Sequence, residues 1–384
     1  WFLFGRDRKV VQTVEFYPPK GVNSSEIGYI IDGSVEDRDL ISLIIFWANQ
    51  GNLKIIEKKN KKGKADGFLL EKQKNLEAKA ETYEKTMFNS LFKEGATVDI
   101  AAVHEEFADA FETAKELLAE KYTESKTCKI FTGKSGISRV VGALLVLVPV
   151  VCLGIFGFME SIENPMTLVI IAPAVLLIVV GAIILTMGYD YKNSSSALKT
   201  KVCFIIGGLL IATGLFLEMF FSVTLLGTMV WGVIAVMTTF ANVGFTMFMR
   251  QRTKYGTDLL GKVLGFKEFI RTAELDRLNR LVEEDALYFY HIIPYAYVFG
   301  LSDKWAKKFE TIATVEPDWY AGGQGGAGFN TYLFMNSFNH CTSELQSNLA
   351  TPPAVTSSAQ GGGSNFPSGG GFSGGGMGGG GGRW

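Results

Sequence analysis

The sequence predicts a mainly α-helical integral membrane protein, in which a four-helix transmembrane block is flanked by a winged-helix-like α+β domain and a small helical domain. Three observations predict this fold class. Residues 137–249 hold long apolar stretches with few charges, the flanking residues repeat apolar positions at helical spacing, and residues 350–384 are mostly Gly, Ser, Pro and Ala. Such apolar stretches are typical of membrane spans, and the last segment is expected to be a disordered tail.

The four predicted spans cover residues 137–159, 165–188, 202–220 and 227–249. A helix crosses the hydrocarbon core of a bilayer with about 20 apolar residues. The only charge in the first two segments is Arg139, near the start of the first. The apolar stretch from residue 202 to residue 249 is too long for one span, so we expect a turn near its single charged residue, Glu218.

Glu218 is the candidate polar residue inside the membrane. An ionisable group within a span is a functional candidate by default, as a proton or ion site. The simpler interpretation places Glu218 in the turn between the third and fourth spans, near the outer membrane surface.

Basic residues mark one side of every predicted crossing. Before the first span, in the second loop and after the last span these are Lys129, Lys134, Arg139, Lys192, Lys199, Lys201, Arg250, Arg252 and Lys254. Loops enriched in Lys and Arg face the cytoplasm. The protein is therefore predicted to be a multi-pass cell-membrane protein with both flanking regions in the cytoplasm.

Residues 1–35 form the predicted juxtamembrane segment. Its apolar residues 1–4 precede Arg6, Arg8 and Lys9, a pattern typical of a span that ends at a cytoplasmic surface. We therefore expect a further span, and a region outside the membrane, before residue 1.

Residues 36–136 form the predicted winged-helix-like domain. A helix, a strand, a basic loop and a second strand follow one another, which is the order at the end of a winged helix. These elements are expected over residues 37–49, 53–57, 58–67 and 68–72. Two further helices are predicted over 76–93 and 100–122, because apolar residues recur there at helical spacing.

The loop of this domain is rich in lysine and is the candidate contact for lipid or for a partner. The residues concerned are Lys58, Lys59, Lys61, Lys62 and Lys64. Near the inner leaflet they would attract anionic lipid, whereas a winged helix would place them on DNA phosphates. The helix before the loop lacks a matching Arg or Asn cluster, and a solvated turn is the simplest interpretation.

Residues 250–349 form the predicted small helical domain. An amphipathic helix over 266–282 is followed by an apolar, aromatic segment over 287–299. That segment is too short for a span and contains His291 and Pro294. We expect it to pack under the preceding helix or to lie at the membrane interface.

No catalytic motif occurs in the sequence, so we predict no enzyme activity, no cofactor and no metal site. Cys-x-x-Cys, HExxH, GxSxG and a phosphate-loop lysine are absent, and the three His residues are scattered. The formal net charge of −1 removes bulk attraction to nucleic acid. The expected partners are membrane lipids and another protein.

Several short motifs in a fixed order resemble one family. They are Trp1 with Gly5-Arg6-Asp7, then Glu15-Phe16-Tyr17-Pro18-Pro19, Gly28-Tyr29, Asp37-Arg38-Asp39-Leu40, Arg252-Thr253, Gly265-Phe266-Lys267, Pro294-Tyr295-Ala296 and Trp319-Tyr320. In this order they are similar to the YciQ-like predicted membrane proteins, over nearly the whole chain. The resemblance implies a bacterial membrane protein with an extracytoplasmic domain upstream, and it implies no known activity. Arg8 and Arg383 stand where the family more often has Pro and Ser.

Two functions are compatible with these features. The first is a non-enzymatic membrane scaffold or sensor that binds a protein or lipid partner on the cytoplasmic side. The alternative is a small transporter or transport accessory protein. A transporter needs polar groups along a central path, and the predicted spans offer few besides Glu218.

Overall fold

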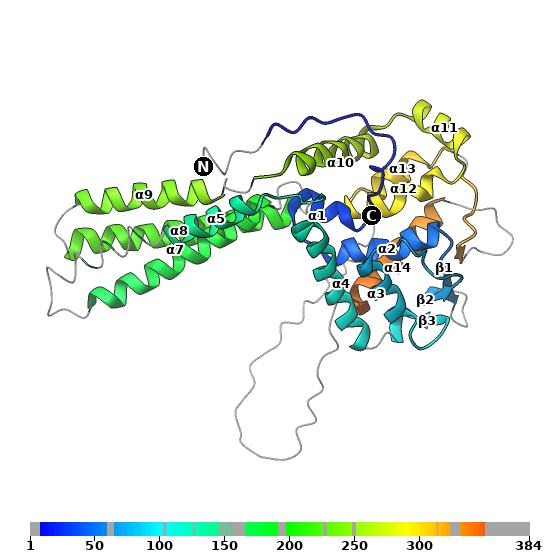
Figure 1. The fold of residues 1–384 in the computed structure, drawn as a ribbon, viewed down its shortest axis with the longest axis horizontal. Helices are drawn as coiled ribbons and strands as arrows, with labels where there is room; N and C mark the ends of the chain where they lie inside the picture. Colours follow the sequence, from blue (N-terminus) through cyan, green and yellow to red (C-terminus); the bar gives the residue numbers. More distant parts are fainter. Residues whose placement is uncertain are drawn as a thin grey trace, which may run out of the picture. The chain divides into compact units, whose positions relative to one another are not determined.

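The computed structural model describes residues 8–59, 65–102, 105–125, 127–145, 166–190, 197–225, 229–247, 251–312, 314–322 and 331–349, with residues 148, 152 and 155. The apolar residues 1–4, the tip of the lysine loop and the tail 350–384 lie outside this part of the chain. Figure 1 shows the described elements as a bundle of long helices and a globular domain.

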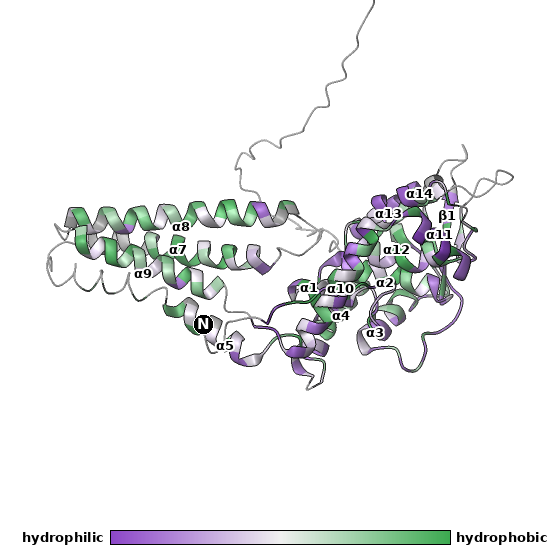
Figure 2. Ribbon diagram, turned by 90° about the horizontal axis from the view of Figure 1, so that it is seen from above, coloured by the Kyte–Doolittle hydropathy of each residue, from purple (hydrophilic) through white to green (hydrophobic). Residues whose placement is uncertain are grey.

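Three helices make up most of the described membrane block: α7 (Met166–Asp190), α8 (Ala197–Leu225) and α9 (Met229–Met247). Each contains a stretch long and apolar enough to cross a membrane. Figure 2 shows that apolar residues dominate all three helices. Large side chains such as Leu209, Phe216 and Phe240 are exposed, as expected for helices whose outer surface is in contact with lipid rather than water.

Close backbone contacts hold α7 and α8 together. A Cβ atom at Gly207 would lie 3.0 Å from the carbonyl oxygen of Gly181, and one at Gly214 would lie 2.6 Å from Cγ1 of Ile178. Small residues are favoured where membrane helices approach closely. The three helices share a small apolar core formed by Ile178, Ala182, Ile211 and Val243.

The first predicted span lies only partly within the described residues. Helix α5 (Gly133–Leu145) covers its beginning and packs against α9. Ile137, Val140 and Leu144 are exposed on α5. Most of the following residues up to position 165 lie outside the described part of the chain.

The position of Glu218 differs from the sequence prediction. Helix α8 runs without a break to Leu225, so Glu218 lies inside the helix and not in a turn. The segment between Gly214 and Gly227 contains no Gly or Pro that would end a helix. Near the end of α8 the Thr224 hydroxyl donates to the carbonyl oxygen of Phe220 at 2.7 Å.

We define the globular domain as the described residues 8–131 and 251–349. It has one hydrophobic core, formed by residues that come before and after the membrane block in the sequence. From the sequence, residues 36–136 and 250–349 were predicted to be separate domains. Their union follows from α12 (Tyr288–Val298), which is the predicted apolar segment 287–299 and is buried over nearly its whole length. A helix that is apolar all round needs partners on every side. One side of α12 packs against α2 (Asp37–Asn49).

Tyrosine hydroxyls fix α12 within this core. Tyr290 donates to the carbonyl oxygen of Val315 at 2.7 Å, and Tyr295 donates to that of Val22 at 3.2 Å. Tyr288 donates to the carbonyl oxygen of Phe16. Buried hydroxyls of this kind need such partners, and these three connect α12 to segments far away in the sequence.

The sheet contains the two predicted strands and two further ones. Strands β1 (Leu53–Lys59) and β2 (Ala65–Lys72) form an antiparallel hairpin. Strand β3 (Thr97–Asp99) pairs with β2, and β4 (Tyr320–Ala321) runs parallel to β1, which gives the order β3-β2-β1-β4. The helix–hairpin order behind the winged-helix prediction is present, but the hairpin is the centre of a four-stranded sheet.

The globular domain contains further described helices besides α2 and α12. They are α1 (Glu26–Asp32), α3 (Thr82–Leu91), η1 (Ile100–Ala102), α4 (Glu105–Glu124), α10 (Lys254–Thr272), α11 (Leu275–Glu284), α13 (Ser302–Lys308) and α14 (Thr331–Leu349). The helix predicted over 76–93 begins only at Thr82.

The extended segment before α1 lies along α10. A Cβ atom at Gly261 or Gly265 would collide with the carbonyl oxygen of Val11 or Thr13, so two glycines one turn apart make room for the segment's backbone. Phe16 packs edge-on against Phe269 of α10, with ring centroids 5.1 Å apart. Juxtamembrane residues therefore belong to the globular domain.

Candidate functional site

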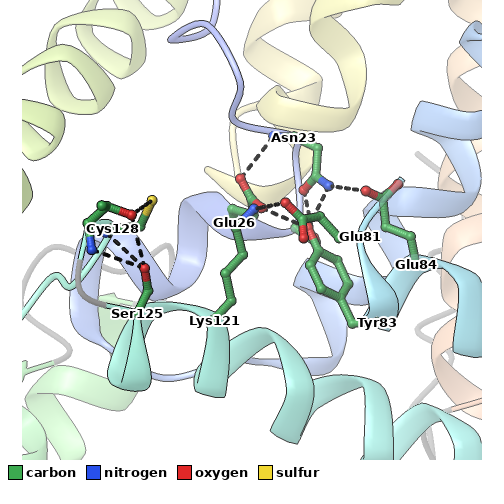
Figure 3. Close-up of polar contacts among 10 residues, drawn as sticks. Asn23, Glu26, Glu81, Tyr83, Glu84, Lys121, Ser125 and Cys128 are labelled. Atoms are coloured by element: carbon green, nitrogen blue, oxygen red, sulfur yellow. Dashed lines mark hydrogen bonds and ion pairs between the residues drawn. The ribbon is translucent and has the colours of Figure 1, made fainter. Parts of the chain in front are cut away.

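An open pocket of about 370 Å³ lies between α1, the start of α3 and the end of α4. Its wall is formed by Gly21, Val22, Asn23, Glu26, Phe46, Gln50, Leu76, Glu77, Lys79, Ala80, Glu81, Glu84 and Lys121. Figure 3 shows the polar side chains that meet at this place. We call it the α1 pocket.

Glu26 is the central group of the α1 pocket and is 1% exposed. Its Oε1 accepts hydrogen bonds from Lys121 Nζ at 2.6 Å and from the Tyr83 hydroxyl at 2.8 Å, and its Oε2 accepts from the Asn23 backbone at 3.3 Å (Figure 3). Burial raises the pKa of Tyr83 well above its ordinary value, and Glu26 raises it further. Tyr83 is thus a neutral donor to a buried carboxylate.

Lys121 joins two acids of the pocket. Its Nζ lies 2.6 Å from Glu26 and 2.6 Å from Glu81, whose side chain is half exposed. Burial alone would lower the pKa of Lys121, but the attraction of Glu26 and Glu81 outweighs burial and raises it. Lys121 therefore stays charged and compensates part of the negative charge.

Glu84 forms a second buried acid at the α2 side of the pocket. It accepts a hydrogen bond from Trp47 Nε1 at 3.1 Å. It also accepts one from Asn23 Nδ2 at 3.1 Å, which is drawn in Figure 3. Burial raises the pKa of Glu84 even though these donors act in the opposite direction. The neighbouring carboxylate of Glu26 adds to the increase.

The α1 pocket is acidic overall. Four acids (Glu26, Glu77, Glu81 and Glu84) and two lysines (Lys79 and Lys121) line it, which gives a formal charge of 2 − 4 = −2 when all are ionised. No group of three His, Cys, Asp or Glu side chains suited to a metal ion is found among the described residues. The arrangement is therefore suited to binding a cationic group.

The two chain segments that connect the globular domain to the membrane block are hydrogen-bonded to each other. Phe131, just before α5, and Arg252, just after α9, form an antiparallel bridge. The amide of Thr132 donates to the carbonyl oxygen of Gln251 at 2.9 Å, and that of Thr253 donates to Ile130 at 2.9 Å. We call this pair of segments the neck.

Arg252 connects the neck to α1. Its guanidinium donates to the carbonyl oxygens of Ile30 at 2.7 Å and Ile31 at 2.6 Å, in the last turn of α1. It also lies 4.6 Å from the ring centroid of Phe131. A cation at a helix C-terminus is favoured by the helix dipole and by the carbonyl groups that lack helical partners. Helix α1 thus has the pocket at one end and the neck at the other.

Of the predicted site residues, Lys58 and Glu218 have described side chains, and neither lines the α1 pocket. Lys58 forms a 2.6 Å ion pair with Asp99 on β3, and the hydrogen bond from Lys58 lowers the pKa of Asp99. The side chain of Lys59 and the residues Lys61, Lys62 and Lys64 lie outside the described part of the chain. Contact of these lysines with lipid or a partner stays a prediction.

Glu218 is buried in the membrane block and is 2% exposed. Among the described residues, neither of its carboxylate oxygens has a hydrogen-bond partner. The hydroxyl oxygen of Thr239 on α9 is likewise buried and without a partner there.

Neither Glu26 nor Glu84 was identified as a site residue from the sequence, and Arg252 entered there as a marker of membrane orientation and as part of the Arg252-Thr253 motif. Glu26 meets Tyr83 and Lys121, which are 57 and 95 positions away in the chain. No local pattern indicates such a cluster. For Arg252 the sequence offered one weak indication of its position. It directly precedes Thr253, whose side chain caps α10, so it lies just before the start of a helix.

The fold and the neck define a multi-pass membrane protein whose globular domain is interrupted in sequence by its own membrane helices. A family model described as "Predicted membrane protein (DUF2207) C-terminal domain" matches residues 13–196 and 186–309. These ranges cover most of the chain, and the chain belongs to this family. No curated protein and no solved structure is significantly similar to it.

Proposed function

We propose that the protein is a non-enzymatic membrane sensor, in which binding at the α1 pocket is transmitted through α1 and the neck to the membrane helices. One observation carries the proposal: Glu26 and Arg252 hold the two ends of the same short helix. A ligand that changes the contacts of Glu26 changes the position of α1, and the carbonyl groups bound by Arg252 belong to α1.

The ligand proposed for the α1 pocket carries an amine or guanidinium group, as a small organic cation or a basic side chain of a partner protein does. The pocket's formal charge favours such a group, and Glu77 and Glu81 are its most exposed acids. Apolar surface from Val22 and Leu76 lies beside them and would contact the ligand's carbon chain.

We also propose that residues 137–159 form a fourth span and that both flanking regions lie in the cytoplasm. The shared core requires residues 8–131 and 251–349 to lie on the same side of the membrane. The number of crossings between them is therefore even. The three described candidate spans are an odd number, and the segment that begins with α5 supplies the missing crossing. The charge bias of the loops supports the cytoplasmic side.

We also propose that, within its family, the chain is similar to the YciQ-like proteins. It rests on the order of the short motifs, of which Arg252-Thr253 lies at the neck and Gly265-Phe266-Lys267 lies on α10. The alternative function, a small transporter, is supported by one observation, which is the burial of Glu218 in α8.

The ligand-binding part of the proposal is tested by titrating spermidine, a small organic polycation, into the full chain in lipid nanodiscs. We expect saturable binding that is weakened at least tenfold in the double variant Glu77→Gln/Glu81→Gln. Glu116→Gln is the matched control, because Glu116 is an exposed acid of α4 outside the pocket. Equal binding by all three proteins overturns the assignment of the pocket.

The transmission part is tested by hydrogen exchange on the same samples. Spermidine is expected to change amide protection in α1 and in residues 251–253. In Arg252→Lys, which keeps the charge but loses the two-pronged hydrogen bonding, the change in α1 should persist and the change in 251–253 should be lost. A change confined to the pocket in the native chain contradicts transmission.

A further inference from the structure

We propose that Glu218 is a proton-binding site of the membrane block, occupied when α8 and α9 are packed as in this structure. The proposal is independent of the sensor function. It rests on a carboxyl group that is 2% exposed, lies within an apolar helix, and has no hydrogen-bond partner at either oxygen among the described residues.

Glu218 lies on the buried stripe of α8. Ile211, Glu218 and Ser222 are buried at spacings of seven and four residues, which places them on one side of the helix. Helix α9 has a matching stripe with the same periodicity: Gly232, Ala235, Thr239, Val243 and Thr246.

The close approach of α8 and α9 fixes their register. A Cβ atom at Gly232 would lie 2.8 Å from Cβ of Ser222 and 2.9 Å from the sulfur of Met219. The two helices follow each other after a short connection and pack together. Going back along α8 from Ser222 to Glu218 therefore corresponds to going forward along α9 from Gly232, in the direction of Ala235 and Thr239. Glu218 and Thr239 thus belong to the same interface.

The depth of Glu218 places it below the membrane surface. The apolar stretch of α8 covers Thr200–Thr224, and Glu218 lies about 9 Å from its midpoint at about 1.5 Å per residue. The half-thickness of a hydrocarbon core is about 15 Å. Glu218 is therefore surrounded by protein and lipid, and not by the aqueous phase.

Among the described residues, no charged group faces Glu218 from α7 or α9, the helices packed against α8. By sequence, α9 has no titratable residue, and α7 has only Tyr189 and Asp190 at its last two positions. Those positions are next to Gly188, which packs against Cys203 near the other end of α8. On α8 itself the remaining titratable residues are Lys199, Lys201 and Cys203, also near that end.

An ionised carboxylate in such surroundings is strongly unfavourable, and a group in this position takes up a proton instead. The reaction is the binding of one proton from water to the carboxylate, which yields the neutral acid. The neutral acid costs far less to bury than the carboxylate does, and Glu218 is buried where α8 packs in the membrane block. Proton occupancy and the packing of α8 against α9 are thereby linked.

The test uses the full chain in lipid nanodiscs and a hydrophobic carbodiimide, which modifies protonated carboxyl groups inside membranes. Peptide mapping is expected to show modification of Glu218 at neutral pH, decreasing at alkaline pH. Asp190, at the end of α7, serves as the internal control and should react much less. Absence of modification at Glu218 over the whole pH range overturns the proposal.

A second measurement does not depend on reagent access. Infrared difference spectra between neutral and alkaline pH should contain a band of a protonated carboxyl group that is absent in Glu218→Gln and shifted in Glu218→Asp. Gln is the neutral isostere of the protonated acid, so Glu218→Gln should fold with the helix content of the native chain. An unchanged band in that variant shows that Glu218 is not the proton site.

Discussion

The Lys121 ammonium nitrogen lies 2.6 Å from Oε1 of Glu26, and this contact joins the end of α4 to the start of α1. Glu26 is 1% exposed on its side chain and Lys121 is 20% exposed. Because Glu26 has little access to water, its negative charge depends on Lys121, Tyr83 and Asn23 for compensation. Breaking this pair is therefore expected to cost more stability than breaking an ion pair on the surface.

Lys121→Met is expected to destabilise the globular domain by about 3 kcal/mol, because it leaves a buried carboxylate without its cation. Methionine keeps most of the aliphatic stem. The measurement is urea-induced unfolding of the full chain, followed by the fluorescence of buried tryptophans such as Trp47.

Lys115→Met is the matched control for this prediction. Lys115 lies on the same helix, and its side chain is 18% exposed, but its partners Asp37 and Glu112 are 37% and 61% exposed. Its loss should cost less than about 1 kcal/mol. Equal losses in the two variants contradict the special role of Glu26.

Arg252→Gln is expected to weaken the attachment of α1 to the neck. The substitution removes two charge-assisted hydrogen bonds to Ile30 and Ile31, at a cost of about 2–3 kcal/mol. Hydrogen exchange should become faster in the last turn of α1 and in residues 251–253. Arg271→Gln is the control, since Arg271 forms an exposed pair with Glu268, and it should leave exchange in α1 unchanged.

Glu84→Gln is expected to reduce the pH dependence of stability. Burial raises the pKa of Glu84 in the folded state, so the folded chain holds a proton that the unfolded chain has released. Between the ordinary pKa of a glutamate, about 4.3, and the raised folded value, native stability should fall as pH increases. Above the folded value this loss is complete.

The measurement is the thermal unfolding midpoint of native chain and variant across that pH window. The variant should show a flatter profile, and the two profiles should differ most above the folded pKa of Glu84. Glu116→Gln, an exposed change on α4, should preserve the native slope. A Glu84→Gln profile parallel to the native one means that other groups cause the dependence.

Gly265→Ala is expected to loosen the juxtamembrane segment from α10. The added methyl group would collide with the carbonyl oxygen of Thr13, and such overpacking costs about 1–3 kcal/mol. Limited proteolysis should then cleave the segment before α1 faster than in the native chain. Gly95→Ala, with no atom within 4 Å of the added group, should leave the cleavage rate unchanged.

Local elements were predictable from sequence where one physical signal dominated. The helix 37–49 is observed with the same bounds as α2, because its apolar stripe and Gly51 mark it clearly. The two strands around the lysine loop are observed as well. Membrane helices α7 and α9 follow from long apolar stretches without charge.

Features that depend on distant parts of the chain were not predictable in the same way. Strand β4 has two residues and exists through its pairing with β1, more than 260 positions earlier. The burial of α12 results from partners on both sides of the membrane block. The acids of the α1 pocket come from segments that sequence reasoning treated separately, so nothing indicated that Glu26 and Lys121 meet.

The orientation of the membrane block leads to the last prediction. In a chain whose four native cysteines are replaced, a membrane-impermeant maleimide is expected to label Asn164→Cys on intact cells. Asn193→Cys should react only after permeabilisation, because its loop contains Lys192, Lys199 and Lys201.

The shared core adds a control that is independent of the charge bias. Lys9 and Glu284 are both exposed and lie on opposite sides of the membrane block in sequence. Because their segments contribute to one globular domain, Lys9→Cys and Glu284→Cys must show the same accessibility, whichever side that is. Protection of both on intact cells places the domain in the cytoplasm, and labelling of both reverses the orientation while keeping an even number of crossings. Labelling of only one is incompatible with the fold, since no single core extends across a bilayer.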